Sequence, residues 1–595
     1  MNRKLVSDLL LRILCGAIVL CAVPALQAAA FTNPCPRFQP GSVVTEPPNL
    51  FSHDGVLEVN LDYYTTVDPN IPLDQAPIPL PPPFATGLQQ FCFTTPDGQE
   101  QPTLHVWPGD HLVMHVKNNA PDSLVFEADQ TIDYNQAPGE NNTSMVGIAP
   151  ASPCLAANLT PASTNIDFHG LNIANKCGQN DVLRTIINSG QRFTYNVEIP
   201  ENTAPGLYWY HPHIHGTTDG TNQGGASGAI IVEGIQNIQP AVAGLPVQTL
   251  VVRDQPVPGG PFPLIGSEVP SWDLTVNYVT ISSCQDPQPC NPNQFVGDFK
   301  PAVLQMKPGE RQFWRLVDAT NHIPLHLQLL YDGVPQSLQI VALDGVPVNS
   351  DGGTEEGRTI TRTDILLEPS ARVEFIIKGP SESVKNAVFQ TLRVSTGPGG
   401  DNHPQRPLFT IQTSEDAPEP PVTIPRVSDL PDSRKIADLA DAKPIKTRDL
   451  YFSEVLQDPN NPLGPTNFFL TEVGATPTLF TIDNPPAIVT TQGSVEDWTI
   501  ENHAMEDHAF HIRNLHFLLL AINGVPVPRE QQQYLDVVDL PFWDGVSAYP
   551  NVTVRMDFRG ADVGDLLYEC TFLTHADDGM RAILRVLPNP QNAAN

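Results

Sequence analysis

The sequence predicts an all-β protein built from three β-sandwich domains. Its 595 residues include 62 prolines and 41 glycines, which break the chain into short segments without long helical periodicity. Many of these segments alternate between apolar and polar residues, as half-buried strands do. In "HLVMHV" (111–116), for example, Leu112, Met114 and Val116 fall on one face.

One unit recurs along the chain and defines the domains. The stretches 103–120, 302–320 and 487–504 each show a strand, a tight turn, a second strand and a polar stop. Their turn glycines Gly109, Gly309 and Gly493 are roughly two hundred residues apart, so the repeat is a whole domain. We therefore expect domains over 31–240, 241–425 and 446–595, with a linker over 426–445 that lies within the acidic, proline-rich stretch 413–446.

The first 30 residues have the features of a secretory signal peptide. Arg3 and Lys4 precede an apolar run from Ile13, and small residues stand at 28–30. An uncleaved anchor is the alternative, but Pro24 and the shortness of the run argue against it. No later segment is apolar for long enough to span a membrane. We expect an exported protein, periplasmic or extracellular.

The cysteines fit an oxidising compartment. Two of the nine lie in the signal segment and Cys570 belongs to a motif discussed below, which leaves an even set of six. Six cysteines allow 15 pairings, and we expect three disulfides between sequence neighbours. The expected pairs are Cys35–Cys92, Cys154–Cys177 and Cys284–Cys290.

Composition excludes some classes of function. The formal net charge of −33 argues against a nucleic-acid partner, since phosphate binding needs a basic face. It favours solubility and the attraction of cations. The glycine-containing stretch 216–228 lacks the lysine of a phosphate-binding loop, and we interpret it as a loop that leads into a strand.

Histidines cluster in the first and the third domain, and each cluster lies at a pair of positions separated by one residue. On a strand, alternate side chains share a face, so each pair can direct both residues at one point. Four such pairs of positions occur: Asp167/His169, His211/His213, His511/Arg513 and Glu569/Thr571. Two domains packed together would bring the four pairs to a common interface.

These motifs resemble those of the multicopper oxidases, the family of laccases, ascorbate oxidase and cuprous oxidases with three cupredoxin-like, Greek-key β-sandwich domains. The resemblance rests on "HPHIHG" (211–216), "DHAFHI" (507–512) and the C-x4-H-x4-M spacing of Cys570, His575 and Met580, and it covers nearly the whole mature chain. It implies a blue (type 1) copper site in the last domain, with His508, Cys570, His575 and Met580 as ligands. A thiolate and two imidazoles suit a cycling copper ion, and a weak thioether tunes its potential. By the same resemblance, Cys570 and His575 are the residues of electron entry.

The family's trinuclear copper centre is matched incompletely. The family fills eight positions with histidine, whereas here only His169, His211, His213 and His511 remain. When the family's ligand positions are carried over to this chain, the type 2 copper has Asp167 and His511. One type 3 copper then has His169, His211 and Thr571, and the other has His213, Arg513 and Glu569. A guanidinium is always protonated and cannot be a ligand. Arg513 and Glu569 form a complementary charge pair that can fill the vacant volume.

Two hypotheses remain open for this residual centre. In the first, Asp167, His169, His211 and His511 hold one metal ion, with His213 as a ligand or as an orienting residue. In the second, these residues are held by hydrogen bonds and bind no metal. Glu569 and Thr571, on either side of Cys570, also replace the two histidines through which, in the family, electrons pass between the two copper centres.

The sequence therefore predicts an exported copper oxidoreductase that oxidises a small reductant, such as a phenol or a metal ion, one electron at a time. The acceptor is dioxygen at the reduced centre or a partner electron carrier. The alternatives are a non-enzymatic scaffold with the same fold, or an electron-transfer or copper-binding protein that does not reduce dioxygen.

Overall fold

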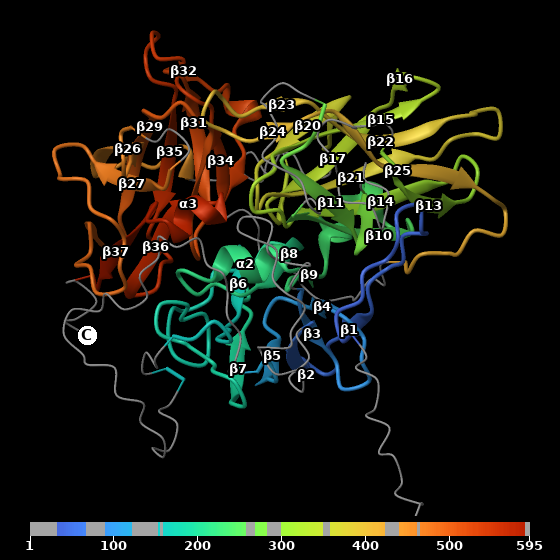
Figure 1. The fold of residues 1–595 in the computed structure, drawn as a ribbon, viewed down its shortest axis with the longest axis horizontal. Coiled ribbons are helices and arrows are strands. Elements are labelled where there is room, and N and C mark those ends of the chain that lie inside the picture. Colours follow the sequence, from blue (N-terminus) through green and yellow to red (C-terminus); the bar gives the residue numbers. More distant parts are fainter. Residues whose placement is uncertain are drawn as a thin grey trace, which may run out of the picture. The chain divides into compact units, whose positions relative to one another are not determined.

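The structure is a computed structural model, and it describes residues 33–66, 90–121, 153–154, 159–256, 268–281, 299–348, 358–422, 439–460 and 464–589. Seven β-sheets make up most of these residues. Helices are short and few among these residues (Figure 1). The predicted all-β class is therefore confirmed. The signal segment, the Cys284–Cys290 pair and most of the linker lie outside the described residues.

Two sheets are formed by residues 49–232 and share one hydrophobic core. The first has the order β1 (Asn49–Phe51), β4 (Thr103–Val106), β9 (Gly228–Val232), β8 (Gly206–His211), β6 (Asp167–His169). The second has the order β3 (Phe91–Thr94), β2 (Val56–Thr65), β5 (His111–Asn118), β7 (Arg192–Glu198). In β5 the predicted face is the buried one, since Leu112 and Met114 are 0% exposed.

The middle of the chain forms two larger sheets and a small ribbon. The larger sheet has the order β12 (Val279–Ile281), β11 (Trp272–Val276), β10 (Val247–Pro256), β14 (Arg311–Asp318), β21 (Arg372–Lys378), β17 (Leu338–Leu343), β18 (Val346–Pro347), with β19 (Ile360–Arg362) on β17. The other has the order β13 (Ala302–Met306), β25 (Arg406–Thr413), β22 (Ala387–Leu392), β15 (Leu325–Tyr331), β16 (Val334–Pro335), with β20 (Asp364–Leu367) on β15. The ribbon pairs β23 (Val394–Ser395) with β24 (Asn402–His403). Trp314 of β14 packs between the two sheets against Phe389 and Phe409.

The last part repeats the arrangement with two further sheets. One has the order β27 (Thr466–Glu472), β26 (Lys446–Leu456), β29 (Val495–Asn502), β35 (Asn551–Asp557), β31 (Phe517–Ile522), β32 (Val525–Pro526), with β33 (Tyr534–Leu535) on β31. The other has the order β28 (Ile488–Thr491), β37 (Arg581–Leu587), β36 (Gly564–Cys570), β30 (His508–Ile512), β34 (Val537–Leu540). Trp498 of the first sheet meets Tyr568 of the second edge to face.

The recurring sequence unit has the same structure each time. In each copy a tight turn takes the chain from one sheet to the other, from β4 to β5, from β13 to β14 and from β28 to β29. The turn residues Gly109, Gly309 and Gly493 have φ of 85°, 66° and 93°, a region that glycine enters without steric cost. The sheets group as the repeat predicts, while the domain boundaries near 240 and 425 stay a prediction.

Two short helices connect the parts that carry the candidate site. α2 (Thr218–Gln223) lies against α3 (Leu573–Asp577). The prediction of a loop over 216–228 is wrong for the six residues of α2. Their composition favours turns, but Asp577 accepts hydrogen bonds from the backbone N–H groups of Gly216 and Asp219, and these contacts hold the helix.

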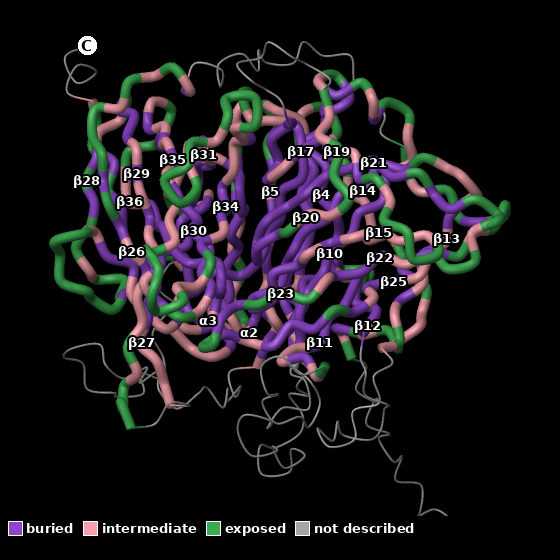
Figure 2. Tube along the Cα trace, turned by 90° about the horizontal axis from the view of Figure 1, so that it is seen from above, coloured by how far each residue is buried: buried purple, intermediate pink, exposed green. Residues whose placement is uncertain are grey.

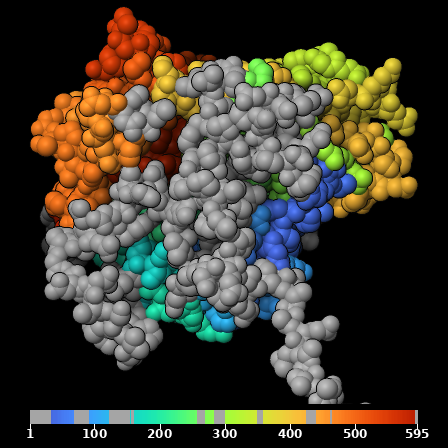
Figure 3. All heavy atoms as spheres, viewed as in Figure 1, coloured from blue at the N-terminus to red at the C-terminus, as the bar shows by residue number. Residues whose placement is uncertain are grey.

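Burial follows the strands, and the exposed residues lie mainly in the connections (Figure 2). Figure 3 shows one face of the molecule, with residues outside the described ranges in grey. No helix among the described residues is long and apolar enough to cross a membrane. Two predicted disulfides are confirmed, Cys35–Cys92 and Cys154–Cys177, and Cys570 is a buried free cysteine.

Candidate copper centre and a neighbouring ionic cluster

The first cluster is formed where β30, β36 and α3 meet. β30 and β36 are antiparallel neighbours, and Phe510 pairs with Cys570. The chain leaves β36 at Cys570, makes the single turn of α3 and returns as β37. Two backbone hydrogen bonds close this turn, from Cys570 N–H to the carbonyl of Met580 and from Met580 N–H to that of His575. The segment 570–580, which carries the C-x4-H-x4-M spacing, thus folds back on itself.

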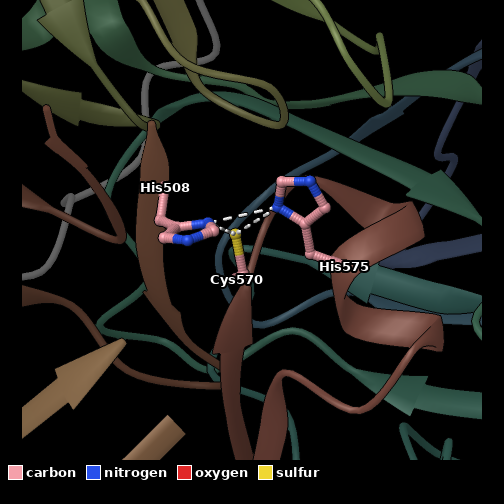
Figure 4. Close-up of side chains that lie close together, drawn as sticks. All are labelled: His508, Cys570 and His575. Carbon is pink, nitrogen blue, oxygen red and sulfur yellow. Dashed lines mark hydrogen bonds between the residues drawn. The ribbon is translucent and has the colours of Figure 1, made fainter. Parts of the chain in front are cut away.

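Three donor atoms of this cluster converge (Figure 4). The Nδ1 atoms of His508 and His575 are 3.2 Å apart, and each faces the Cys570 Sγ, at 3.8 and 3.9 Å. All three side chains are buried, as is Met580. The structure therefore brings together the four residues predicted for the type 1 site, although no contact of the Met580 sulfur defines its role.

Apolar rings enclose the two imidazoles. Phe468 stacks on the His575 ring at 4.3 Å and Phe572 stacks at 5.2 Å, while Phe452 contacts His508 at 5.2 Å. Burial and the neighbouring His575 hold the pKa of His508 well below 6.5, so its imidazole is neutral and keeps a lone pair. Neutral imidazole is the form that binds metals.

The donor set of the first cluster fits a copper ion. A point equidistant from the three atoms lies about 2.1 Å from each, a normal length for metal–imidazole and metal–thiolate bonds. Two imidazoles, a thiolate and a nearby thioether are the ligand types of electron-transferring copper. In the second cluster, by contrast, the side chains bind one another.

The second cluster joins the first part of the chain to the last. In the antiparallel pair β6 and β8, Asp167 stands opposite His211. Their side chains meet residues of β30 and β36 from the last sheet, and the His169 ring stacks on the His511 ring at 4.3 Å. The four predicted pairs of positions therefore do reach a common interface.

Arg513 neutralises Asp167 inside this interface. The Arg513 Nη1 donates to Asp167 Oδ2 at 2.6 Å, and its Nη2 contacts the other carboxylate oxygen. Both residues are buried. Burial raises the pKa of Asp167, but Arg513 and His211 outweigh it and hold that pKa well below 3.8. The carboxylate is ionised, and its charge is already matched by a cation.

Glu569 has two further partners besides the expected Arg513. Arg513 lies within ion-pair range of Glu569, at 3.8 Å, but makes its hydrogen bonds to Asp167. Glu569 also contacts His213 Nε2 at 2.9 Å and Arg581 Nε at 3.2 Å. Burial raises the pKa of Glu569, and His213 and Arg581 more than compensate, so the carboxylate stays ionised.

The predicted residual metal set divides into two groups. Asp167, His169 and His211 have ligand atoms within 4.8 Å of one another, and so do His169, His511 and Asp536. His511 does not join the first group. Asp536 was missed by sequence reasoning, because nothing in "YLDVVDL" (534–540) marks it.

Asp536 also has a cation of its own. Arg372, from the middle of the chain, donates two hydrogen bonds of 2.7 Å to its carboxylate. A narrow pocket between the clusters is lined by His169, His211 and Thr571, and reaches Cys570. Of the described residues, this cluster holds three carboxylates, and an arginine faces each of them.

Comparisons with known proteins agree with this geometry. Two sequence models of the multicopper oxidase family match residues 155–237 and 456–590, which contain every predicted ligand position. No curated protein sequence matches significantly.

Solved structures share the fold at low identity. A multicopper oxidase from Campylobacter jejuni, described as a metallo-oxidase, is 17% identical with a TM-score of 0.58, covering 93% of this chain and 96% of its own. The McoA multicopper oxidase of the hyperthermophile Aquifex aeolicus is 15% identical with a TM-score of 0.58, covering 92% and 99%. A laccase-like enzyme of the lignin-degrading bacterium Ochrobactrum sp. is 17% identical with a TM-score of 0.56, covering 91% and 100%.

The family models identify residues 155–237 and 456–590 as multicopper oxidase domains, the solved structures share the cupredoxin-like fold, and the converging donor set fits the copper cofactor that the family implies.

Proposed function

We propose that this protein is an exported copper oxidoreductase that takes single electrons from a small reductant at one type 1 site. The observation that carries the proposal is the convergence of His508, Cys570 and His575 on one point. Copper held there supplies a centre that cycles between its cuprous and cupric states. The residues themselves determine how a donor reaches it.

His575 is the proposed point of electron entry. It is 7% exposed, whereas His508 is 0% exposed, so a donor approaches the site most closely at the His575 ring. The His575 Nε2 lies 3.3 Å from Glu506, at the edge of the ring that faces away from Cys570. Phe468 and Phe572 both stack on the ring and make its surroundings apolar.

We further propose that the trinuclear copper centre is not assembled. Arg513 supplies a permanent positive charge at a position where the family has a ligand, and Thr571 and Glu569 replace two more. The ion pairs Arg513–Asp167 and Arg581–Glu569 support this, because they satisfy the charges that remain. Four-electron reduction of dioxygen is then not the activity of this chain.

For the residual set, the geometry favours the hypothesis without a metal. Both oxygens of Asp167 face Arg513, so coordination by this carboxylate would break a buried ion pair. His213 is hydrogen-bonded to Glu569, and we propose that it is not a metal ligand. A single metal at Asp167, His169 and His211 is the competing outcome.

Export is part of the proposal. Two disulfides support an oxidising compartment, where such bonds persist. The reductant is proposed to be a phenol or a metal ion, and the acceptor a partner electron carrier. A scaffold protein without redox activity is the second candidate, and the converging donor set argues against it.

A reductive titration tests the proposal. Copper-loaded protein is titrated without oxygen, using a ferrous salt or a phenol, while the visible thiolate–copper absorption is followed. We expect about one electron per chain to bleach the absorption completely, and slow return of colour in air. Uptake of four electrons per chain with rapid oxygen consumption would contradict the proposal, and a protein that takes up no electron would be a scaffold.

A further inference from the structure

Exposed apolar residues occur in three segments that contacts link to the His575 site. Large side chains that are normally buried stand exposed there: Val546 is 89% exposed, Val455 57%, Met505 43% and Tyr549 37%. They come from three segments, 451–460, 501–507 and 541–550, which we call the entry face. Exposed apolar residues that gather over one site mark an interaction surface more often than residues scattered singly.

Contacts connect the entry face to the copper site. Glu506 touches His575, and Glu454 is hydrogen-bonded to Glu506 and to the backbone N–H of Met505. The Met505 side chain in turn approaches Gly545. Trp543 N–H donates to the carbonyl of Ala504, which fixes the third segment to the second.

Four rings of the entry face contact one another in sequence. Tyr549 and Tyr451 stack on His503, with ring centroids 3.7 and 4.6 Å away, and Trp543 contacts Tyr549 at a tilted angle with a centroid distance of 4.9 Å. Tyr451 precedes Phe452, which contacts His508. The stack makes this surface rigid, and a rigid surface loses little conformational entropy when a partner binds.

The charge of the entry face has one sign. The acids of the three segments that are exposed or half-buried and do not donate a hydrogen bond to another carboxylate are Asp458, Glu501, Glu506 and Asp544, and the segments contain no lysine or arginine. Apolar residues beside a one-signed set of charges fit a protein partner with a basic rim, since complementary charge steers association. A metal ion would make no use of the exposed apolar side chains.

We propose that the entry face is the docking surface for a small basic protein that carries single electrons. This inference rests on the proposed function, because a chain that cannot reduce dioxygen needs another acceptor. Each turnover then moves one electron from the reductant into the site and one electron out to the carrier. The partner's redox group is brought to the His575 edge, the most exposed edge of the donor set.

The test uses cytochrome c as a basic electron-carrier probe and measures its binding by calorimetry, with copper-loaded and with metal-free protein. Variants of the entry face are Glu501→Lys and Val546→Ser. Their controls are Glu530→Lys and Val525→Ser, which change an exposed acid and a 67% exposed valine of the same part of the chain outside the entry face.

We expect binding that weakens at least tenfold in Glu501→Lys and severalfold in Val546→Ser, is unchanged in the controls and is lost at high salt. No binding, or equal binding by all variants, would overturn the docking surface. The same holds if Glu501→Lys affects only the oxidation of ferrous ion, since the face would then serve a metal ion. Binding without electron transfer would leave the surface in place and contradict the proposed function instead.

Discussion

The copper cluster (His508, Cys570, His575 and Met580) and the ionic cluster around Asp167 and Glu569 are neighbours in space, yet their buried polar side chains face different kinds of partner. At the first, the donor atoms of His508, Cys570 and His575 face one another across distances that suit a metal ion. At the second, Asp167 and Glu569 are matched by Arg513 and Arg581. Glu569 of the ionic cluster and Cys570 of the copper cluster are consecutive residues, so a single peptide bond separates the two clusters.

Under the proposed function, this difference would explain how the interface tolerates an unassembled metal centre. A buried charge must be paired, by a metal or by another side chain. Replacing ligand histidines singly would leave charges or lone pairs unmatched. Here an acid and a base stand at contacting positions, so ion pairs join the first and last parts of the chain, and we propose that they take the place of copper.

The largest effect is expected from Cys570→Ser. The thiolate is the donor that binds copper most strongly and gives the site its visible absorption, so the variant should lose that absorption and all one-electron activity. Absorption spectra of copper-loaded protein measure the loss. Thermal unfolding of the metal-free variant should stay near that of the parent, and retained blue colour would show that the site is elsewhere.

Restoring histidines should make the second cluster bind copper, as the first is proposed to do. A variant with Asp167→His, Arg513→His, Glu569→His and Thr571→His removes both members of the Arg513–Asp167 pair and provides imidazoles at the four altered positions. We expect copper per chain to rise above that of the parent, measured by elemental mass spectrometry. An unchanged copper content in a folded variant would mean that these four positions do not determine metal loading.

Arg513→Leu should destabilise the protein by about 3–5 kcal/mol, because it leaves the buried Asp167 carboxylate without its cation. Arg585→Leu is the control, since Arg585 pairs with Asp565 at the surface and such pairs contribute under about 1 kcal/mol. Urea unfolding compares the two. The double variant Arg513→Leu/Asp167→Leu should recover part of the lost free energy of unfolding. Equal decreases in that free energy for Arg513→Leu and Arg585→Leu would contradict the role given to this ion pair.

A smaller, pH-dependent effect is expected at His322, which helps to hold α3. Its Nδ1 contacts Asp254 at 2.8 Å and its Nε2 contacts Thr574, beside His575, at 2.5 Å. Burial lowers the pKa of His322, but Asp219 and Asp254 outweigh it and raise the pKa to about 9. Because this pKa is above the unfolded value of about 6.5, the stabilisation is full below pH 6.5 and is lost as the pH rises through 9.

The pH dependence of unfolding separates this effect from others. His322→Gln should lose roughly 3 kcal/mol relative to the parent at pH 6, and little at pH 10. His326→Gln is the control, because His326 pairs with Asp364 near the surface and its loss should matter little at either pH. A pH-independent difference between parent and His322→Gln would contradict a charged His322.

The fold could be predicted because alternation identified strands such as β5 and the turn glycines marked the repeat. The residues of the first cluster came from the resemblance to the multicopper oxidases, and the structure brings them together, while their role as copper ligands stays a prediction. The ionic cluster joins strands from distant parts of the chain, and its pairings are set by packing.

Particular residues show that limit. Arg513 has a carboxylate at Asp167 and another at Glu569, and only the structure shows that it hydrogen-bonds to Asp167. Asp536 and Arg372 stand in segments without a motif, and they meet only because the middle and last parts of the chain pack together. The helix α2 was missed because its contacts with Asp577, rather than its own propensities, hold it.

The central claim is that one cluster holds copper and the other holds ion pairs. The most direct test is the number of copper ions per chain, by elemental mass spectrometry on mature protein that has been loaded with copper and then desalted. The account predicts about one copper per chain, lost in Cys570→Ser. A value near four would contradict it, because the ion pairs of Arg513 and Arg581 would then have to give way to an assembled trinuclear centre.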